Sequence, residues 1–187
     1  HAKTQQRYRE FLWGQANLPG PAREGWRFTD YRCATPEQRT AYDAVLEWAS
    51  GKGKPWLFLR GTPGTGKTHL SAAAVSALVG GGVAARYEYV PGLVDFLRAG
   101  QIDGRTEERI AQLQSIEALV LDDLAATSSS DTEWARGEVL KVVDYRYRER
   151  APLLVTPHSV DLGTWDPRLL DRLTARWLRS EVRMAWE

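Results

Sequence analysis

The octet from Gly61 to Thr68, GTPGTGKT, has the residue types and spacing needed to bind a triphosphate. It fits the phosphate-loop pattern G-x-x-x-x-G-K-[ST], in which glycines let consecutive backbone N–H groups turn toward phosphate oxygens. We expect the Lys67 ammonium to lie between the β- and γ-phosphates and the Thr68 hydroxyl to coordinate Mg²⁺. The residues predicted to bind nucleotide are Gly61, Thr62, Pro63, Gly64, Thr65, Gly66, Lys67 and Thr68.

Two acids, Asp122 and Asp123, follow the apolar run 119–121. In nucleotide triphosphatases of this class, an acid at the tip of a buried strand holds Mg²⁺ and the next acid polarises the attacking water. We assign the metal to Asp122 and the water to Asp123, although two acids can also simply mark a strand end. Asp123 is one methylene shorter than the Glu common in this class, so we expect slow hydrolysis.

Two further sets of residues are candidates for contact with the γ-phosphate. Thr156 and His158 follow the apolar run 153–155, and His158 is equally compatible with a loop histidine without a role. Arg168, Arg172 and Arg176 are spaced four apart, so on a helix they share one face. This face is either a solvated basic stripe or the source of an arginine finger, since a guanidinium can clamp a phosphate bidentately.

The order of the predicted elements positions these residues at one edge of a sheet. Apolar runs predict strands at 56–59, 83–90, 118–121 and 153–156, and helical spacing predicts helices between them. Thr35, Pro36 and Gln38 form a capping box that predicts the start of a helix before the first strand. Alternating strands and helices imply a parallel sheet with right-handed crossovers, hence a three-layer α/β/α sandwich of the P-loop NTPase class.

The composition limits the class of protein further. The chain has 187 residues, 43% of them hydrophobic, and no apolar stretch approaches the about 18 residues needed to span a bilayer. A single cysteine, Cys33, excludes an internal disulfide and favours a reduced, cytoplasmic compartment. The net charge of +1 means that any nucleic-acid surface must be a local patch. We expect an N-terminal helix and linker at 1–24 and one ATPase domain at 25–187.

Beyond these features, the chain resembles the AAA+ (ASCE-type) helicase loaders of bacteria, the DnaC/DnaI type, and the related ATP-binding partners of insertion-sequence transposases. The resemblance covers about residues 25 to 187. The segments that carry it are GTPGTGKTHL at 61–70, LVLDDL at 119–124, EWAR at 133–136, VDYRY at 143–147, PLLVT at 152–156 and DRL at 171–173.

The resemblance implies an ATPase that uses ATP, ADP and Mg²⁺, self-associates through its ATP site and binds single-stranded DNA. It also implies a replicative DNA helicase as partner and gives Arg172 the role of arginine finger. Two positions depart from the family. His158 stands where a sensor Asn is usual, and a sensor arginine expected after a C-terminal aromatic falls beyond Glu187. We therefore expect slow turnover and a sequence that is part of a longer protein.

Several alternatives stay open from the sequence. A transposase-associated ATPase shares the same core, a P-loop small-molecule kinase also carries arginines in its lid, and an ATP-binding scaffold would not hydrolyse at all. Among residues that could contact DNA, no single one stands out from the set Arg86, Tyr87, Tyr89 and Arg105.

Overall fold

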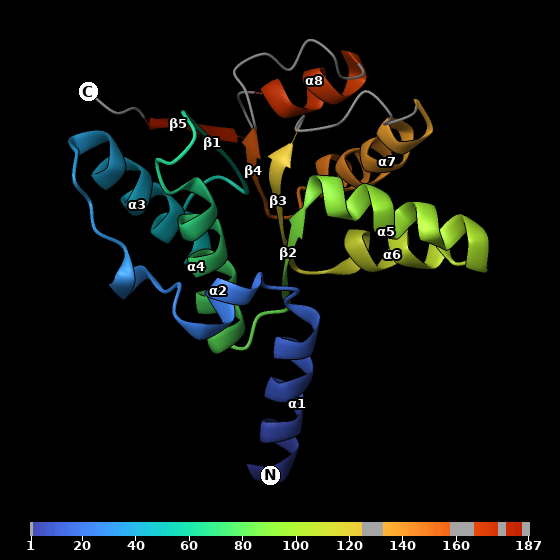
Figure 1. Cartoon of the computed structure of the whole chain (residues 1–187), viewed down its shortest axis with the longest axis horizontal. Helices are drawn as coiled ribbons and strands as arrows, with labels where there is room; N and C mark the ends of the chain where they lie inside the picture. The colour runs from blue at the N-terminus through green and yellow to red at the C-terminus, as the bar shows by residue number, and fades with distance from the viewer. Residues whose placement is uncertain (1, 125–132, 158–166, 176–178, 185–187) are drawn as a thin grey trace.

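The computed structural model describes residues 2–124, 133–157, 167–175 and 179–184 (Figure 1). The strands are β1 (Trp56–Gly61), β2 (Ala85–Tyr89), β3 (Ala118–Leu124), β4 (Leu153–Pro157) and β5 (Arg179–Met184). The helices are α1 (Ala2–Gln15), α2 (Gly20–Glu24), the 3₁₀ turn η1 (Phe28–Asp30), α3 (Pro36–Ala49), α4 (Lys67–Gly80), α5 (Val90–Asp103), α6 (Thr106–Ser115), α7 (Glu133–Glu149) and α8 (Pro167–Thr174). The four predicted strands are confirmed, while α2 and β5 were not predicted.

The described strands form one parallel sheet in the order β2-β3-β4-β1-β5. Side chains alternate along each strand between two cores, so that Phe58 and Leu121 face one side and Leu57 and Val120 the other. Helices α5, α6, α7 and α8 cover the first side, and α3 and α4 cover the second (Figure 1). The predicted three-layer sandwich is therefore confirmed, and the doubly covered strands explain the continuous apolar runs.

Strand β5 completes the sheet beside β1, with pairs running from Trp56 with Arg179 to Gly61 with Met184. It was missed because four of its six residues are polar and only Met184 is fully buried, as expected of an edge strand. A side chain at Gly61 would collide with the carbonyl oxygen of Met184. The first glycine of the octet is thus required by strand packing.

Arg146 on α7 gives the long helix a structural anchor. Its side chain is completely buried, and burial lowers the pKa of its guanidinium to about 10, so it remains charged at neutral pH. The guanidinium donates hydrogen bonds of 2.7–3.3 Å to the carbonyls of Leu113, Gln114, Ile116, Glu117 and Pro152. It thereby joins the end of α6 to the segments that enter β3 and β4, the two central strands that lead to the candidate site.

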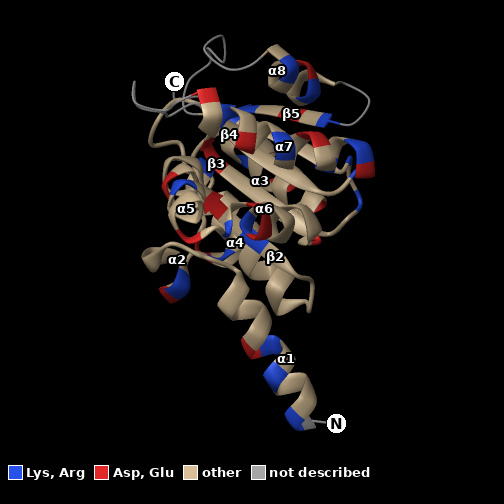
Figure 2. Ribbon diagram, turned by 90° about the vertical axis from the view of Figure 1, so that its right-hand side faces the viewer, with Lys and Arg blue, Asp and Glu red and all other residues tan. Residues whose placement is uncertain are grey.

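The N-terminal segment belongs in part to the same core. Leu12, Ala16, Leu18 and Ala22 are buried with residues of α4, and the Tyr87 amide donates to the Ala16 carbonyl at 2.9 Å. The rest of α1 projects away from the body (Figures 1 and 2). The division of the chain near residue 24 stays a prediction. In the described ranges, no helix has the length and apolarity that crossing a membrane requires.

Candidate nucleotide-binding site

The loop between β1 and α4 has the conformation that its glycines allow. Gly64 and Gly66 have φ angles of 83° and 94°, in the left-handed region. Lys67 is buried, and its ammonium donates to the carbonyls of Gly61 at 2.8 Å and Thr62 at 3.1 Å. Burial lowers the pKa of Lys67, while the nearby Asp123 and Asp122 act in the opposite direction. The ammonium thus already lies over the loop and points back onto its backbone.

Two side chains from upstream of β1 hold the loop from outside. The Tyr31 hydroxyl donates to the Thr65 carbonyl at 3.0 Å, and the Gln38 amide donates to the same oxygen at 3.5 Å. Burial, with a smaller contribution from Cys33, raises the pKa of Tyr31 to about 12, so its hydroxyl remains a donor. The Tyr31 ring occupies the place where a side chain at Gly66 would be.

Gln38 performs a second task, which the sequence did predict. Its side-chain oxygen accepts a hydrogen bond from the backbone amide of Thr35 at 3.3 Å. The Thr35 hydroxyl in turn accepts one from the backbone amide of Gln38 at 3.2 Å. The predicted capping box at the start of α3 is confirmed, and it also fixes the residue that reaches the loop. The role of Tyr31 was missed because no motif connects it to a loop 34 residues further along the chain.

A hollow of about 440 Å³ lies over the loop, and we call it the phosphate hollow. Its lining residues are Trp26, Pro63, Gly64, Gly66, Lys67, Thr68, His69 and Asp123. Trp26 stacks on His69 with ring centres 5.5 Å apart. The structure therefore brings the predicted loop and Asp123 together in a cavity with the volume of a small-molecule site.

Asp122 lies at the end of β3, with only 1% of its surface exposed, and both of its carboxylate oxygens accept hydrogen bonds. The Tyr87 hydroxyl donates to one oxygen and the Thr156 hydroxyl to the other. Burial and the charge of Asp122 raise the pKa of Tyr87 well above its usual range, so this phenol stays protonated. Donors from the two flanking strands, β2 and β4, thus fix the carboxylate.

Tyr87 was also considered as a DNA contact, and the structure shows that this was wrong. Its side chain is only 4% exposed and lies inside the core. A buried phenol bonded to Asp122 cannot form a stacking surface for bases.

The residues around Asp122 fit a magnesium-bound nucleotide. In the described part of the chain, no three His, Cys, Asp or Glu side chains are grouped to hold a metal ion by themselves. Mg²⁺ is usually held by one or two protein oxygens, phosphate oxygens and water. Asp122 and Thr68 supply oxygens of this kind.

Asp123 has a different environment from its neighbour. Its φ of 58° is in the left-handed region, which is unusual for a residue other than glycine. Its amide donates to the Thr156 hydroxyl at 3.0 Å, and the residue lines the phosphate hollow. The two adjacent acids therefore have separate positions, one buried and one facing the hollow.

We predict that Asp123→Asn binds Mg-ATP with unchanged affinity and hydrolyses it at least about a hundredfold more slowly. The amide keeps the size of the side chain but cannot accept a proton from water, and a positioned base contributes roughly 10²–10⁴-fold to a rate. Phosphate release and equilibrium binding of a fluorescent ATP analogue measure the two quantities. Unchanged hydrolysis would show that another group orients the water.

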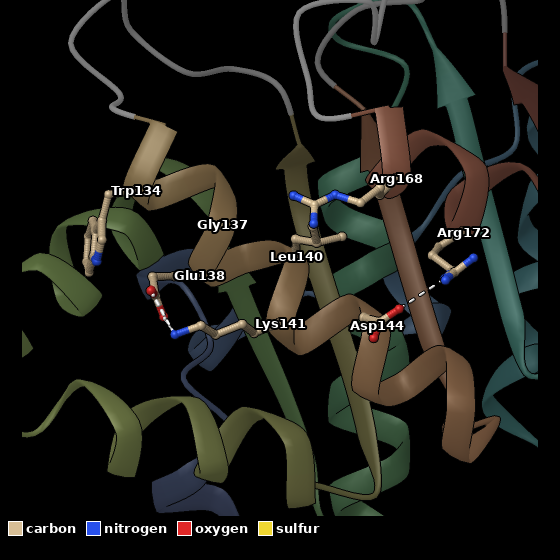
Figure 3. A pocket seen from close by; sticks show the side chains of 8 residues that line it. All are labelled: Trp134, Gly137, Glu138, Leu140, Lys141, Asp144, Arg168 and Arg172. Carbon is tan, nitrogen blue, oxygen red and sulfur yellow. Dashed lines mark hydrogen bonds and ion pairs between the residues drawn. The ribbon is translucent and has the colours of Figure 1, made fainter.

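Of the other candidates for γ-phosphate contact, Thr156 bonds to Asp122 and Asp123, whereas Arg168 and Arg172 lie elsewhere. His158 and Arg176 are outside the described residues. Arg168 and Arg172 line a groove of about 560 Å³ between α7 and α8, the α7–α8 groove (Figure 3). The two arginines share one face, as predicted. Of the described residues, none lines both this groove and the phosphate hollow.

Arg172 is held by contacts within its own subunit. Its guanidinium donates to Asp144 at 3.0 Å and to Asp171 at 2.7 Å, and it lies 4.5 Å from the centre of the Tyr147 ring. Figure 3 shows the side chain directed toward Asp144. Since about a third of the side chain is exposed, it remains accessible from outside the subunit.

A phosphate loop after β1, an acid pair at the end of β3 and the sheet order β2-β3-β4-β1-β5 define a P-loop nucleotide-binding protein of the AAA+ type. The sequence model of the IstB-like ATP binding protein family matches residues 2–179, and the chain belongs to this family. The resemblance inferred from the motifs is thereby confirmed.

Individual relatives agree with this assignment. An insertion sequence ATP-binding protein of Sinorhizobium fredii is 29% identical over 153 residues, which cover 81% of this chain and 49% of the relative. The replicative helicase loader DnaI of Bacillus subtilis is 29% identical over 156 residues, covering 80% of this chain and 48% of that protein. The chain therefore spans about half the length of these curated relatives.

The fold likewise has close counterparts among solved structures. A crystal structure of DnaI superposes with a TM-score of 0.73 at 20% identity, covering 94% of this chain and 97% of that one. A crystal structure of the DnaC helicase loader gives a TM-score of 0.71 at 20% identity, covering 89% and 99%.

Proposed function

We propose that the chain is the ATPase domain of a helicase loader, which binds Mg-ATP and single-stranded DNA and assists placement of a replicative helicase in the cytoplasm. The observation that carries the proposal is the phosphate hollow, where the loop, Lys67 and Asp123 meet beside a rigidly held Asp122. The similarity to DnaI of Bacillus subtilis supports the loader role.

In the proposed reaction, the loop amides bind the phosphates and Lys67 exchanges its two carbonyl contacts for β- and γ-phosphate oxygens. Asp122 and Thr68 would hold Mg²⁺, which neutralises charge on the phosphate oxygens. Asp123 accepts a hydrogen bond from a water, whose oxygen bonds to the γ-phosphorus while the bond to the ADP oxygen breaks. The proton of the water leaves through Asp123 or phosphate, giving ADP and inorganic phosphate.

A second candidate is the ATPase partner of a transposase. Relatives in Sinorhizobium fredii and Pseudomonas fluorescens are named insertion sequence ATP-binding proteins, the latter 31% identical over 130 residues, covering 70% of this chain and 53% of that protein. Both candidates use the same hollow and differ in the protein to which ATP binding is coupled.

The decisive measurement is ATP turnover with and without single-stranded DNA, with all products identified. We expect slow release of ADP and phosphate that rises severalfold when DNA is added, because DNA brings subunits together. A third, phosphorylated product would indicate a small-molecule kinase, and ATP binding without turnover in any condition would indicate a scaffold. Recruitment of a replicative helicase, compared with a transposase, to the DNA-bound protein then separates the two AAA+ candidates.

A further inference from the structure

A second hollow, of about 630 Å³, lies between the projecting helix α1 and helix α2. It shares no lining residue with the phosphate hollow. We call it the α1–α2 hollow, and its lining residues are Trp13, Gly14, Asn17, Leu18, Arg23 and Arg27. The lining contains one aromatic ring and two guanidinium groups and no carboxylate. Trp13 is 39% exposed, which is high for an indole.

The two arginines are fixed to the walls of this hollow by hydrogen bonds. Arg23 donates through Nε to the Leu18 carbonyl at 3.0 Å. Arg27 donates to the Ala22 carbonyl at 3.0 Å and to the Ser76 hydroxyl at 3.3 Å, with its guanidinium 5.7 Å from the centre of the Trp13 ring. A guanidinium has five N–H donors, so each arginine has more donors than these bonds use.

Positive charge continues on the Trp13 side of α1, where it is accompanied by one acid, Glu10, which accepts a hydrogen bond from Gln6 at 3.1 Å. Arg9 precedes Trp13 by four residues and therefore lies on the same side of the helix. Arg7 and Phe11 fall on the opposite side. Figure 2 shows the basic residues of α1 on the part of the helix that projects from the body. The chain as a whole carries a charge of only +1, so this is a local concentration of positive charge.

An exposed ring between cations, with no acid in the lining, matches the chemistry of a single-stranded nucleic acid. Bases stack on aromatic side chains without regard to sequence, and phosphates pair with guanidinium groups. An acidic peptide would satisfy the arginines but would leave the flat face of the indole without a matching group. The volume is in the range of sites that accept a molecule of nucleotide size.

We propose that the α1–α2 hollow binds one nucleotide unit of a DNA single strand, with Trp13 stacking on its base and Arg23 and Arg27 contacting the flanking phosphates. Arg9 then contacts the strand one helical turn further along α1. The inference rests on the proposed function, which requires a single-strand contact, and it gives that contact a location. Of the described side chains of α1 before Gln15, only Leu12 is buried, and the rest of the helix projects from the body. A DNA contact on α1 would explain this projection.

The test is the affinity for a fluorescently labelled oligothymidylate, measured by anisotropy with Mg²⁺ and a non-hydrolysable ATP analogue. We expect Trp13→Ala to weaken binding at least about fivefold and Trp13→Tyr to retain most of the affinity, because a phenol also stacks. We expect Arg23→Ala to weaken binding and to reduce the dependence of log Kd on log salt concentration by about one unit.

The same helix offers matched controls. Phe11→Ala removes a ring that is 57% exposed, and Arg7→Ala removes a cation, both from the opposite side of α1. Both variants are expected to bind the oligonucleotide like the wild type. Binding of the ATP analogue is expected to be unchanged in all of these variants, because the α1–α2 hollow and the phosphate hollow share no lining residue.

The outcomes separate this inference from the function on which it rests. A wild-type protein that binds no oligonucleotide overturns both. A wild-type protein that binds, with Trp13→Ala no weaker than Phe11→Ala, overturns only the location. A Trp13→Tyr variant as weak as Trp13→Ala rules out stacking, and displacement of the oligonucleotide by polyglutamate as readily as by unlabelled oligothymidylate indicates a protein partner instead. Either result overturns the proposal.

Discussion

Replacing Lys67 with alanine is expected to abolish tight ATP binding. The ammonium is buried at the loop, and each charge-assisted hydrogen bond to a phosphate contributes roughly 1.5–3 kcal/mol. Loss of two such bonds corresponds to a fall in affinity of at least about a hundredfold. Isothermal titration calorimetry with Mg-ATP, together with the thermal unfolding midpoint without nucleotide, measures binding and fold separately.

The control for this prediction is Lys52→Ala, which removes an exposed ammonium from the turn after α3. Its affinity for ATP should equal that of the wild type. Lys67→Ala also removes the bonds to the carbonyls of Gly61 and Thr62, so a small decrease in the unfolding midpoint is expected. If Lys67→Ala binds ATP like the wild type, the nucleotide site assigned to this loop is wrong.

Arg172→Ala is expected to lower the ATPase rate of the assembled protein by about 10³-fold without changing ATP binding to the isolated subunit. The motivation is its position in the α7–α8 groove, whose described lining residues are separate from those of the phosphate hollow. If an arginine in this groove acts as a finger, the γ-phosphate that it contacts must belong to another subunit. Wild-type specific activity should therefore rise with protein concentration, and this rise should disappear in the variant.

Arg148→Ala is the matched control, because Arg148 contacts the same carboxylate, Asp144, at 3.6 Å. It should retain the concentration-dependent activity. Mixing Arg172→Ala with Lys67→Ala then tests the direction of action. The first subunit supplies an intact phosphate hollow and the second an intact guanidinium, so a mixed interface should recover turnover. No recovery in a mixture shown to co-assemble would mean that Arg172 acts inside its own subunit or has only a surface role.

The features that could be predicted from the sequence are those encoded by neighbouring residues. The glycine spacing from Gly61 to Gly66, the acids after an apolar run and the capping box at Thr35 each depend on a few consecutive positions. The order of strands and helices followed from apolar runs of the right length. These local signals were sufficient for the fold class and for the positions of Lys67 and Asp123.

The features that were missed depend on residues far apart in the chain. The contact from Tyr87 to Asp122 spans 35 residues and that from Tyr31 to Thr65 spans 34, and no spacing rule connects either pair. Four of the six residues of strand β5 are polar, so its sequence lacks the apolar run that identified the other strands. Trp13 belongs to a predicted helix, but the role proposed for it depends on Arg23 in α2 and on Arg27 just before η1.

The position of β5 has a consequence for how the molecule is made. Trp56 pairs with Arg179, so β1 has no neighbour on that side until residues more than a hundred positions later have left the ribosome. During synthesis, the strand that leads into the phosphate loop is therefore an exposed edge, open to pairing with other nascent chains. Docking of β5 closes that edge and brings Met184 against Gly61. Nucleotide added during synthesis should thus protect chains that extend past residue 184 far better than chains that stop before residue 179.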